Sequence, residues 1–238
     1  MINTVLMDLD GTLLPFEQDA FIKAYMKLLC ADLAPKGYAP EQIVQAVWAG
    51  CDAMINNDGT VLNSVRFWDA FAAVLGDRVR TEEDNLDGFY LGAFDKARLV
   101  LDGESCAKEL VDTLKEKGYT VVLATNPLFP EQAQRTRMAW AGLTLSDFAL
   151  VTHYSNSHFC KPDLRYYEEI LQTIGKTPTE CLMIGNNVAE DMIAEQLGMD
   201  VCLITGHVEN PQDKPIDRFV QKSLGTFLEY AKTLPSIK

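Results

Sequence analysis

The sequence has no long apolar run, since no stretch approaches the roughly 18 apolar residues that a membrane-spanning helix requires. It also lacks the basic segment followed by an apolar one that marks a secretory signal peptide. Basic residues are few, 21 Lys and Arg against 34 Asp and Glu, for a net charge of −13. This balance argues against proteins that bind nucleic acid or an anionic membrane, because both need clustered cations. We therefore expect a cytoplasmic protein that binds neither.

Paired metal-binding cysteines are missing as well. None of the six cysteines forms a C-x-x-C pair, and they are scattered through apolar stretches. Free and mostly buried thiols in a reducing compartment are the simplest interpretation. The three histidines, His153, His158 and His207, stand at no recognisable ligand spacing, so we assign them no metal.

What the sequence does contain is a series of short apolar runs that predict buried strands. Most are rich in Val, Leu and Ile and do not alternate with polar residues, as expected for strands covered on both faces. The predicted strands are 4–9, 120–125, 148–152, 181–185 and 200–205, and the helices among and after them are 104–117, 130–141, 163–174, 189–197 and 224–234. This order predicts an α/β fold, a Rossmann-like, doubly wound parallel sheet.

One region interrupts this pattern. Residues 16–98 contain no convincing strand, and helices are predicted at 20–33, 40–56, 64–75 and 85–97. We therefore predict two domains, an α/β core made of residues 1–15 and 99–238 and an all-α cap made of residues 16–98.

Two carboxylates stand where the first predicted strand ends, in the run Asp8-Leu9-Asp10-Gly11-Thr12. Ligands of open α/β sheets bind beyond the carboxyl ends of the strands. At such a place one carboxylate can attack phosphorus and become an aspartyl-phosphate. The other can protonate the leaving oxygen and later deprotonate water. The alternative interpretation is that the pair only caps a turn.

Three further groups follow later strands. Thr125 and Asn126 can hydrogen-bond a phosphoryl oxygen, although Thr-Asn-Pro is also a common turn. Lys161, just before Pro162, can neutralise phosphate charge, although such a lysine is often only a solvated loop residue. The segment 127–130 that follows Asn126 either shapes a pocket wall or starts the next helix.

The fourth group is the loop at 185–191, which reads Gly-Asn-Asn-Val-Ala-Glu-Asp. Mg²⁺ prefers oxygen ligands in octahedral geometry, and side chains from this loop can supply them together with Asp8 and the backbone carbonyl of Asp10. The alternative is a helix start with Asn187 as its cap and Glu190 as the capping-box partner. Both interpretations can hold at once.

With all four groups at strand ends, the chain resembles the haloacid dehalogenase-like (HAD) hydrolase superfamily, in its phosphatase branch with a helical, C1-type cap. The resemblance implies Asp8 as nucleophile and Asp10 as general acid and base. It also implies that Thr125, Asn126 and Lys161 bind the phosphoryl group. The implied Mg²⁺ ligands are Asp8, Asp10, Asn186 and Asp191, the last one directly or through water.

Two details refine this resemblance. True haloacid dehalogenases of the superfamily lack the second aspartate, so Asp10 favours phosphate transfer to water. The fourth motif commonly begins Gly-Asp, whereas this chain has Gly185-Asn186, so we predict weaker Mg²⁺ binding than in a Gly-Asp relative.

The sequence therefore predicts a Mg²⁺-dependent phosphohydrolase of a small phosphorylated metabolite, as a monomer or homodimer. A sugar-phosphate mutase and a degenerate, non-catalytic binding protein remain the alternatives. In the predicted cap, Arg66 is a possible substrate contact, and Lys23 and Lys27, one helical turn apart, can meet a second anionic group or else form a solvated face. Trp48, Phe67 and Trp68 can contact substrate, or else only pack the cap. The sequence does not name the substrate.

Overall fold

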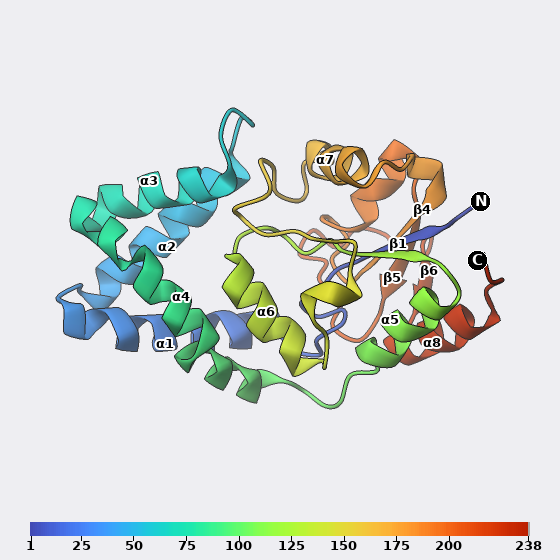
Figure 1. The fold of residues 1–238 in the computed structure, drawn as a ribbon, viewed down its shortest axis with the longest axis horizontal. Helices are drawn as coiled ribbons and strands as arrows, with labels where there is room; N and C mark the ends of the chain where they lie inside the picture. The colour runs from blue at the N-terminus through green and yellow to red at the C-terminus, as the bar shows by residue number, and fades with distance from the viewer. Residues whose placement is uncertain (238) are drawn as a thin grey trace.

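The fold is known from a computed structural model, which describes residues 1–237 and, within them, every side chain except that of Asp84. Its centre is a parallel sheet of six strands in the order β3-β2-β1-β4-β5-β6 (Figure 1). The strands are β1 (Thr4–Met7), β2 (Thr120–Leu123), β3 (Leu150–Val151), β4 (Cys181–Gly185), β5 (Asp200–Ile204) and β6 (Val220–Lys222). The predicted Rossmann-like α/β fold is thus confirmed.

Helices cover both faces of this sheet, which explains why its strands read as continuous apolar runs. Val5 and Met7 of β1 belong to a core cluster shared with α5 (Ala107–Glu116) and α8 (Leu224–Thr233). Leu6, which points to the other face, packs in a cluster with α7 (Leu164–Ile174). Figure 1 shows α7 on one side of the sheet and α5 and α8 on the other.

The sequence prediction missed β6, for a physical reason. Only three residues form it, and two of them, Val220 and Gln221, are exposed at the sheet edge, so no apolar run marks it. The strand predicted at 148–152 is also shorter in the structure, where only Leu150–Val151 pair with β2.

Two predicted helices differ from the structure. The helix predicted at 189–197 is wrong, since only a 3₁₀ helix forms there, over Met192–Leu197. Asn187 Oδ1 does accept the backbone N–H groups of Ala189 and Glu190, but the Glu190 side chain turns to Asn126 and closes no capping box. The helix predicted at 85–97 is divided at Gly92 into α4 (Glu83–Leu91) and a 3₁₀ helix (Ala93–Val100).

Between β1 and β2 the chain forms a helical region, which lies beside the sheet in Figure 1. Its α-helices are α1 (Gln18–Leu33), α2 (Pro40–Ile55), α3 (Asn63–Leu75) and α4. It packs against α6 (Glu131–Trp140) and the segment before it, since the Phe21 ring lies 6.0 Å from Phe129 and 6.4 Å from Trp140. The exact division into a core and a cap of residues 16–98 stays a prediction.

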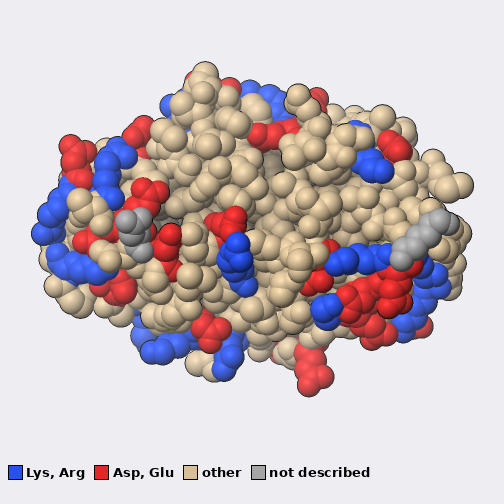
Figure 2. Space-filling view, viewed as in Figure 1, with Lys and Arg blue, Asp and Glu red and all other residues tan. Residues whose placement is uncertain are grey.

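The cysteines, the surface charge and the helix lengths can each be compared with what the sequence predicts. All six cysteines are free, and Cys160, Cys181 and Cys202 are buried. On the face in Figure 2 the basic side chains lie close to acidic ones, with no broad patch of Lys and Arg alone. Among residues 1–237, no helix combines the length and apolar character that crossing a bilayer demands.

Candidate active site

The carboxyl ends of β1, β2 and β4 meet at one edge of the sheet. The register aligns Met7 with both Leu123 and Ile184, so Asp8 emerges at the level where the neighbouring strands also end. The backbone N–H of Asp8 donates to the Ile184 carbonyl over 2.9 Å. Above this edge lies a hollow of about 540 Å³, open to solvent, which we call the acidic hollow. It is lined by Asp8, Asp10, Gln18, Thr125, Asn126, Leu128, Phe129, Asn186, Asn187, Glu190 and Glu209.

Asp8 and Lys161 form the centre of this site. Lys161 Nζ lies 2.9 Å from Asp8 Oδ1, and the lysine side chain has no exposed surface. Burial opposes the charge of the ammonium, but the carboxylates of Asp191 and Asp8 outweigh it and raise the pKa of Lys161 well above its usual value. The lysine therefore stays charged beside the carboxylate.

Asp191 lies behind Lys161. Its Oδ1 is 2.6 Å from Lys161 Nζ, and its Oδ2 accepts the backbone N–H of Asn187 over 2.9 Å. Its side chain packs so closely against Gly185 that a Cβ atom there would lie 2.1 Å from Asp191 Oδ2. Asp191 is not among the residues that line the acidic hollow. Its contacts fix the lysine and the loop, and its place as a metal ligand stays a prediction.

Thr125 and Asn126 line the hollow opposite the loop of β4. The Thr125 carbonyl accepts hydrogen bonds from the hydroxyls of Thr152 (2.6 Å) and Tyr166 (2.9 Å), which fixes the residue. Asn126 Nδ2 donates to Glu190 Oε2 over 3.1 Å. Burial, with the nearby carboxylates, raises the pKa of Glu190 to about 7 although Lys161 acts against it.

Asn186 is bonded on both sides of its amide. Its Oδ1 accepts from the Thr12 hydroxyl over 2.9 Å, and that hydroxyl also lies 3.2 Å from Asp8 Oδ2. Its Nδ2 donates to the His207 carbonyl over 2.6 Å. Gly11, in the left-handed conformation (φ 73°), makes room for this amide, because a Cβ atom there would lie 2.3 Å from Asn186 Nδ2.

Asp10 is held by an arginine that sequence reasoning missed. Arg137, fully buried on α6, forms an ion pair with Asp10 Oδ2 and a hydrogen bond to Gln134. Its guanidinium lies over the rings of Phe129 (4.5 Å) and Phe21 (5.6 Å). Burial raises the pKa of Asp10, and Arg137 limits that rise.

The geometry can be compared with known proteins. A family model for haloacid dehalogenase-like hydrolases matches residues 2–198. The chain belongs to this family. The HAD assignment drawn from the sequence motifs is therefore confirmed, and the acidic hollow lies where those motifs meet. A search of curated proteins gave no match.

Solved structures of HAD proteins share the fold over almost the whole chain. A HAD phosphatase from Thermococcus onnurineus is 18% identical with a TM-score of 0.60, over 96% of this chain and 97% of that one. A 2-haloacid dehalogenase from Pseudomonas syringae pv. Tomato is 20% identical with a TM-score of 0.62, again over 96% and 97%. A Bacillus subtilis chain assigned to the HAD hydrolases, with magnesium bound, is 18% identical with a TM-score of 0.57, over 97% and 98%. Phosphatases and dehalogenases thus share this fold.

A weak signal for Arg137 is present in the HAD chain's sequence. The buried positions of α6 are Ala133, Gln134, Arg137 and Met138, which form one helical stripe. A guanidinium on such a stripe needs a buried partner, since an isolated buried charge is costly. The sequence does not show that the partner is Asp10, because 127 positions separate the two residues.

The acidic hollow also has oxygen atoms suited to a small hard cation. Asp10 Oδ1 and Asn126 Oδ1 are buried and have no hydrogen-bond partner among the described residues. In the described part of the chain, no group of three His, Cys, Asp or Glu side chains is placed to hold a metal. Mg²⁺ needs only one or two protein carboxylates when waters and a phosphate complete its shell. The residues present therefore fit Mg²⁺ better than a metal that demands many side-chain ligands.

Proposed function

We propose that this HAD hydrolase is a Mg²⁺-dependent phosphomonoesterase that acts on a small phosphorylated molecule through an aspartyl-phosphate on Asp8. The observation that carries the proposal is the ion pair at 2.9 Å between Lys161, which is fully buried, and Asp8, which lines the acidic hollow together with Asp10. Haloacid dehalogenation does not need a second carboxylate, whereas phosphate transfer to water needs an acid and base. The presence of Asp10 therefore favours the phosphatase.

The residues divide the reaction into two steps. In the first, an Asp8 oxygen attacks phosphorus, the bond from phosphorus to the ester oxygen breaks, and Asp10 gives a proton to the departing alcohol. In the second, Asp10 takes a proton from water, which attacks phosphorus and releases inorganic phosphate and Asp8. Lys161 and Thr125 hold the phosphoryl oxygens throughout, and the fixed ammonium offsets their charge.

Mg²⁺ would be held by a side-chain oxygen of Asp8, the backbone carbonyl of Asp10 and Asn186, with Asp191 supporting the loop that carries Asn186. When bound, the metal supplies positive charge that stabilises the phosphate during transfer. The magnesium bound to the Bacillus subtilis HAD hydrolase, which has the same fold, supports the choice of this metal. We further propose that residues 16–98 act as a cap over this site, which excludes water when it closes.

Release of inorganic phosphate from a panel of phosphomonoesters, with Mg²⁺ and with a chelator, tests this function. We expect turnover with Mg²⁺ and a loss of about 10²-fold or more when the metal is removed. If an isomerised sugar phosphate accumulates in place of inorganic phosphate, the protein is a mutase. If halide is released from a haloacid while no phosphoester reacts, the phosphatase assignment is wrong.

Changing Asn186→Asp has two opposite expected effects. A carboxylate adds negative charge at the metal, so half-maximal activity should need about 10-fold less Mg²⁺. The same change removes the N–H that donates to the His207 carbonyl at 2.6 Å, so the metal-free protein should lose about 1–3 kcal/mol of unfolding free energy. A Mg²⁺ titration of activity and urea denaturation with a chelator measure the two effects. An unchanged Mg²⁺ dependence would exclude Asn186 from the metal site.

Changing Arg137→Met should impair the function of Asp10. The guanidinium lowers the pKa of Asp10, so without it the carboxylate takes up a proton at higher pH. The limb of the pH–rate profile that reports Asp10 should therefore move to higher pH, and kcat should fall about 10²-fold as the carboxylate loses its fixed position. Arg135→Met is the matched control, since Arg135 lies on the same helix but is exposed and pairs with Glu131. A kcat reduction without a shift of the profile would mean that Arg137 is only structural.

A further inference from the structure

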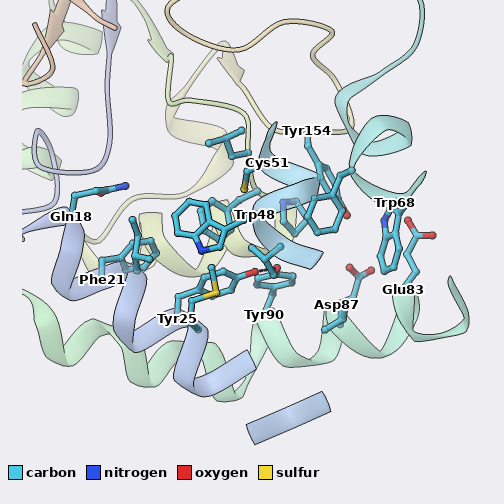
Figure 3. A pocket seen from close by; sticks show the side chains of 18 residues that line it. Gln18, Phe21, Tyr25, Trp48, Cys51, Trp68, Glu83, Asp87, Tyr90 and Tyr154 are labelled. Carbon is cyan, nitrogen blue, oxygen red and sulfur yellow. Dashed lines mark hydrogen bonds between the residues drawn. The ribbon is translucent and has the colours of Figure 1, made fainter. Parts of the chain in front are cut away.

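A second hollow, which we call the aromatic pocket, adjoins the acidic hollow. It encloses about 760 Å³, open solvent at its mouth included, and Figure 3 shows its side chains. Gln18, Leu128 and Phe129 line both spaces, so a molecule bound at Asp8 can extend past them into this pocket. The sequence could not decide whether segment 127–130 forms a pocket wall. In the structure it forms a wall of both spaces.

The chemistry of this pocket is mostly apolar. Eight of its eighteen lining residues are aromatic, namely Phe21, Tyr25, Trp48, Phe67, Trp68, Tyr90, Phe129 and Tyr154. The hydroxyls of Tyr25 and Tyr90 bond to each other over 2.9 Å, as the dashed line in Figure 3 marks, so neither requires a polar group from a ligand. Mostly apolar and aromatic walls with a few polar groups are typical of sites that bind small ligands.

The charges around the pocket limit what can bind. None of its described lining residues is Lys, Arg or His. Glu83 and Asp87 stand at the end away from Gln18 in Figure 3, and Asp87 accepts a hydrogen bond from Gln132 over 2.8 Å. A second phosphate or carboxylate on a substrate would come close to these two carboxylates, and no Lys, Arg or His among the described lining residues would offset its charge, which is unfavourable.

The basic residues that the sequence suggested as substrate contacts do not supply a cation in this pocket. Lys23 and Lys27 are exposed on α1 and do not line the pocket. Arg66 is engaged with Asp58 at 2.6 Å and with Asn57 at 3.0 Å. A sugar is also disfavoured, because a hydroxyl that faces the aromatic part of the lining finds no hydrogen-bond partner there, which costs binding free energy.

We propose that the substrate is a phosphate monoester whose alcohol part is an aromatic or arylalkyl group seated in the aromatic pocket, an inference that rests on the proposed phosphatase function. The phosphoryl group binds at Asp8 and Lys161, and the ring passes Gln18 to lie among the tyrosine and tryptophan rings. Aromatic rings pack there edge-on or offset, which adds to the gain from burying apolar surface. Trp48 lines this pocket and is 47% exposed, so its side chain is accessible to an entering ligand.

A matched pair of substrates tests the proposal. We expect kcat/KM for phenethyl phosphate to exceed that for glycerol phosphate by about 10²-fold, the value for burying one aromatic ring. Trp48→Ala should reduce this ratio about 10-fold, and Trp48→Phe should retain most of it. Leu99→Ala is the control, because Leu99 is 85% exposed, outside both hollows, and should leave the ratio unchanged.

The results of these assays distinguish a wrong substrate class from a wrong phosphatase assignment. If both esters release phosphate with similar kcat/KM, or the glycerol ester is preferred, the substrate class is wrong while the phosphatase stands. If neither ester is hydrolysed, calorimetry with the same two esters still tests the pocket. If phenethyl phosphate then binds more tightly than glycerol phosphate, and Trp48→Ala weakens its binding, the aromatic pocket is supported as a binding site although the phosphatase activity is not. Equal binding of the two esters would overturn the aromatic assignment.

Discussion

Changing Asp8→Asn should reduce kcat by at least about 10⁴-fold. The amide that replaces the carboxylate cannot act as the nucleophile, and loss of a nucleophile removes the covalent route altogether. The substitution is nearly isosteric, so Lys161 at 2.9 Å and the Thr12 hydroxyl at 3.2 Å keep a hydrogen-bonding group to contact. Phosphate release in a steady-state assay with Mg²⁺ measures the effect.

Asp163→Asn provides a matched control for that loss. Asp163 caps α7 at its N-terminus and pairs with Arg165, outside the acidic hollow. Replacing one aspartate with asparagine there should leave kcat within about 2-fold, because Asn is nearly as good a cap as Asp. Should Asp8→Asn retain more than a tenth of the wild-type rate, Asp8 would not be the nucleophile.

Changing Lys161→Met should reduce the unfolding free energy by about 3–5 kcal/mol at neutral pH, measured without Mg²⁺. The lysine side chain is fully buried between Asp8 and Asp191, so its loss leaves two close carboxylates without a cation. Burial already raises the pKa of Asp191 to about 7, against the effect of Lys161, so without the lysine Asp191 binds a proton still more readily in the folded state than in the unfolded one. The loss of stability in Lys161→Met should therefore become smaller as the pH falls and Asp191 becomes protonated.

Asp191→Asn combined with Lys161→Met completes a double-mutant cycle. If the ion pair at 2.6 Å carries the effect, the double variant should lose less stability than the two single variants together. Urea denaturation of the four proteins gives the coupling free energy. Additive losses would mean that the lysine contributes through packing and not through charge.

The placement of Asp8 and Lys161 beside one another could be predicted from sequence, although 153 positions separate them. Asp8 directly follows an apolar run, Lys161 lies in the loop after another, and parallel strands bring their carboxyl ends to one edge. The right-handed crossover rule narrows the possible topologies, whereas the order of the strands is known only from the structure. The same reasoning correctly identified the helical nature of the region between β1 and β2.

The partner of Asp10 could not be predicted in this way. Arg137 comes from a helix, and which side chain it meets depends on how α6 packs against the helical region and on the ring of Phe129. The aromatic pocket could not be predicted from the sequence for a similar reason. Trp48, Phe67 and Trp68 read equally well as core or as substrate contacts, and only the packing of the helices decides that they line a hollow.

In the loop after β4, side-chain hydrogen bonds accompany a departure from the helix that the sequence pattern predicts. The run at 189–197 has helical spacing, but Asn187 and Glu190 are engaged with Glu209 and Asn126, and only a 3₁₀ helix follows. Asn187 still accepts two backbone N–H groups at the start of this run, but Glu190 bonds to Asn126 and closes no capping box. This departure from the local pattern falls at the candidate active site, where such conflicts are expected.

Mass spectrometry of protein mixed with a phosphomonoester and Mg²⁺ and quenched rapidly in acid tests the account most directly. We expect one added phosphoryl group on the peptide that contains Asp8, and none in Asp8→Asn. We also expect the modified fraction to decay as inorganic phosphate appears. A turnover that leaves Asp8 unmodified at every time point, or a phosphoryl group found on another residue, would contradict it.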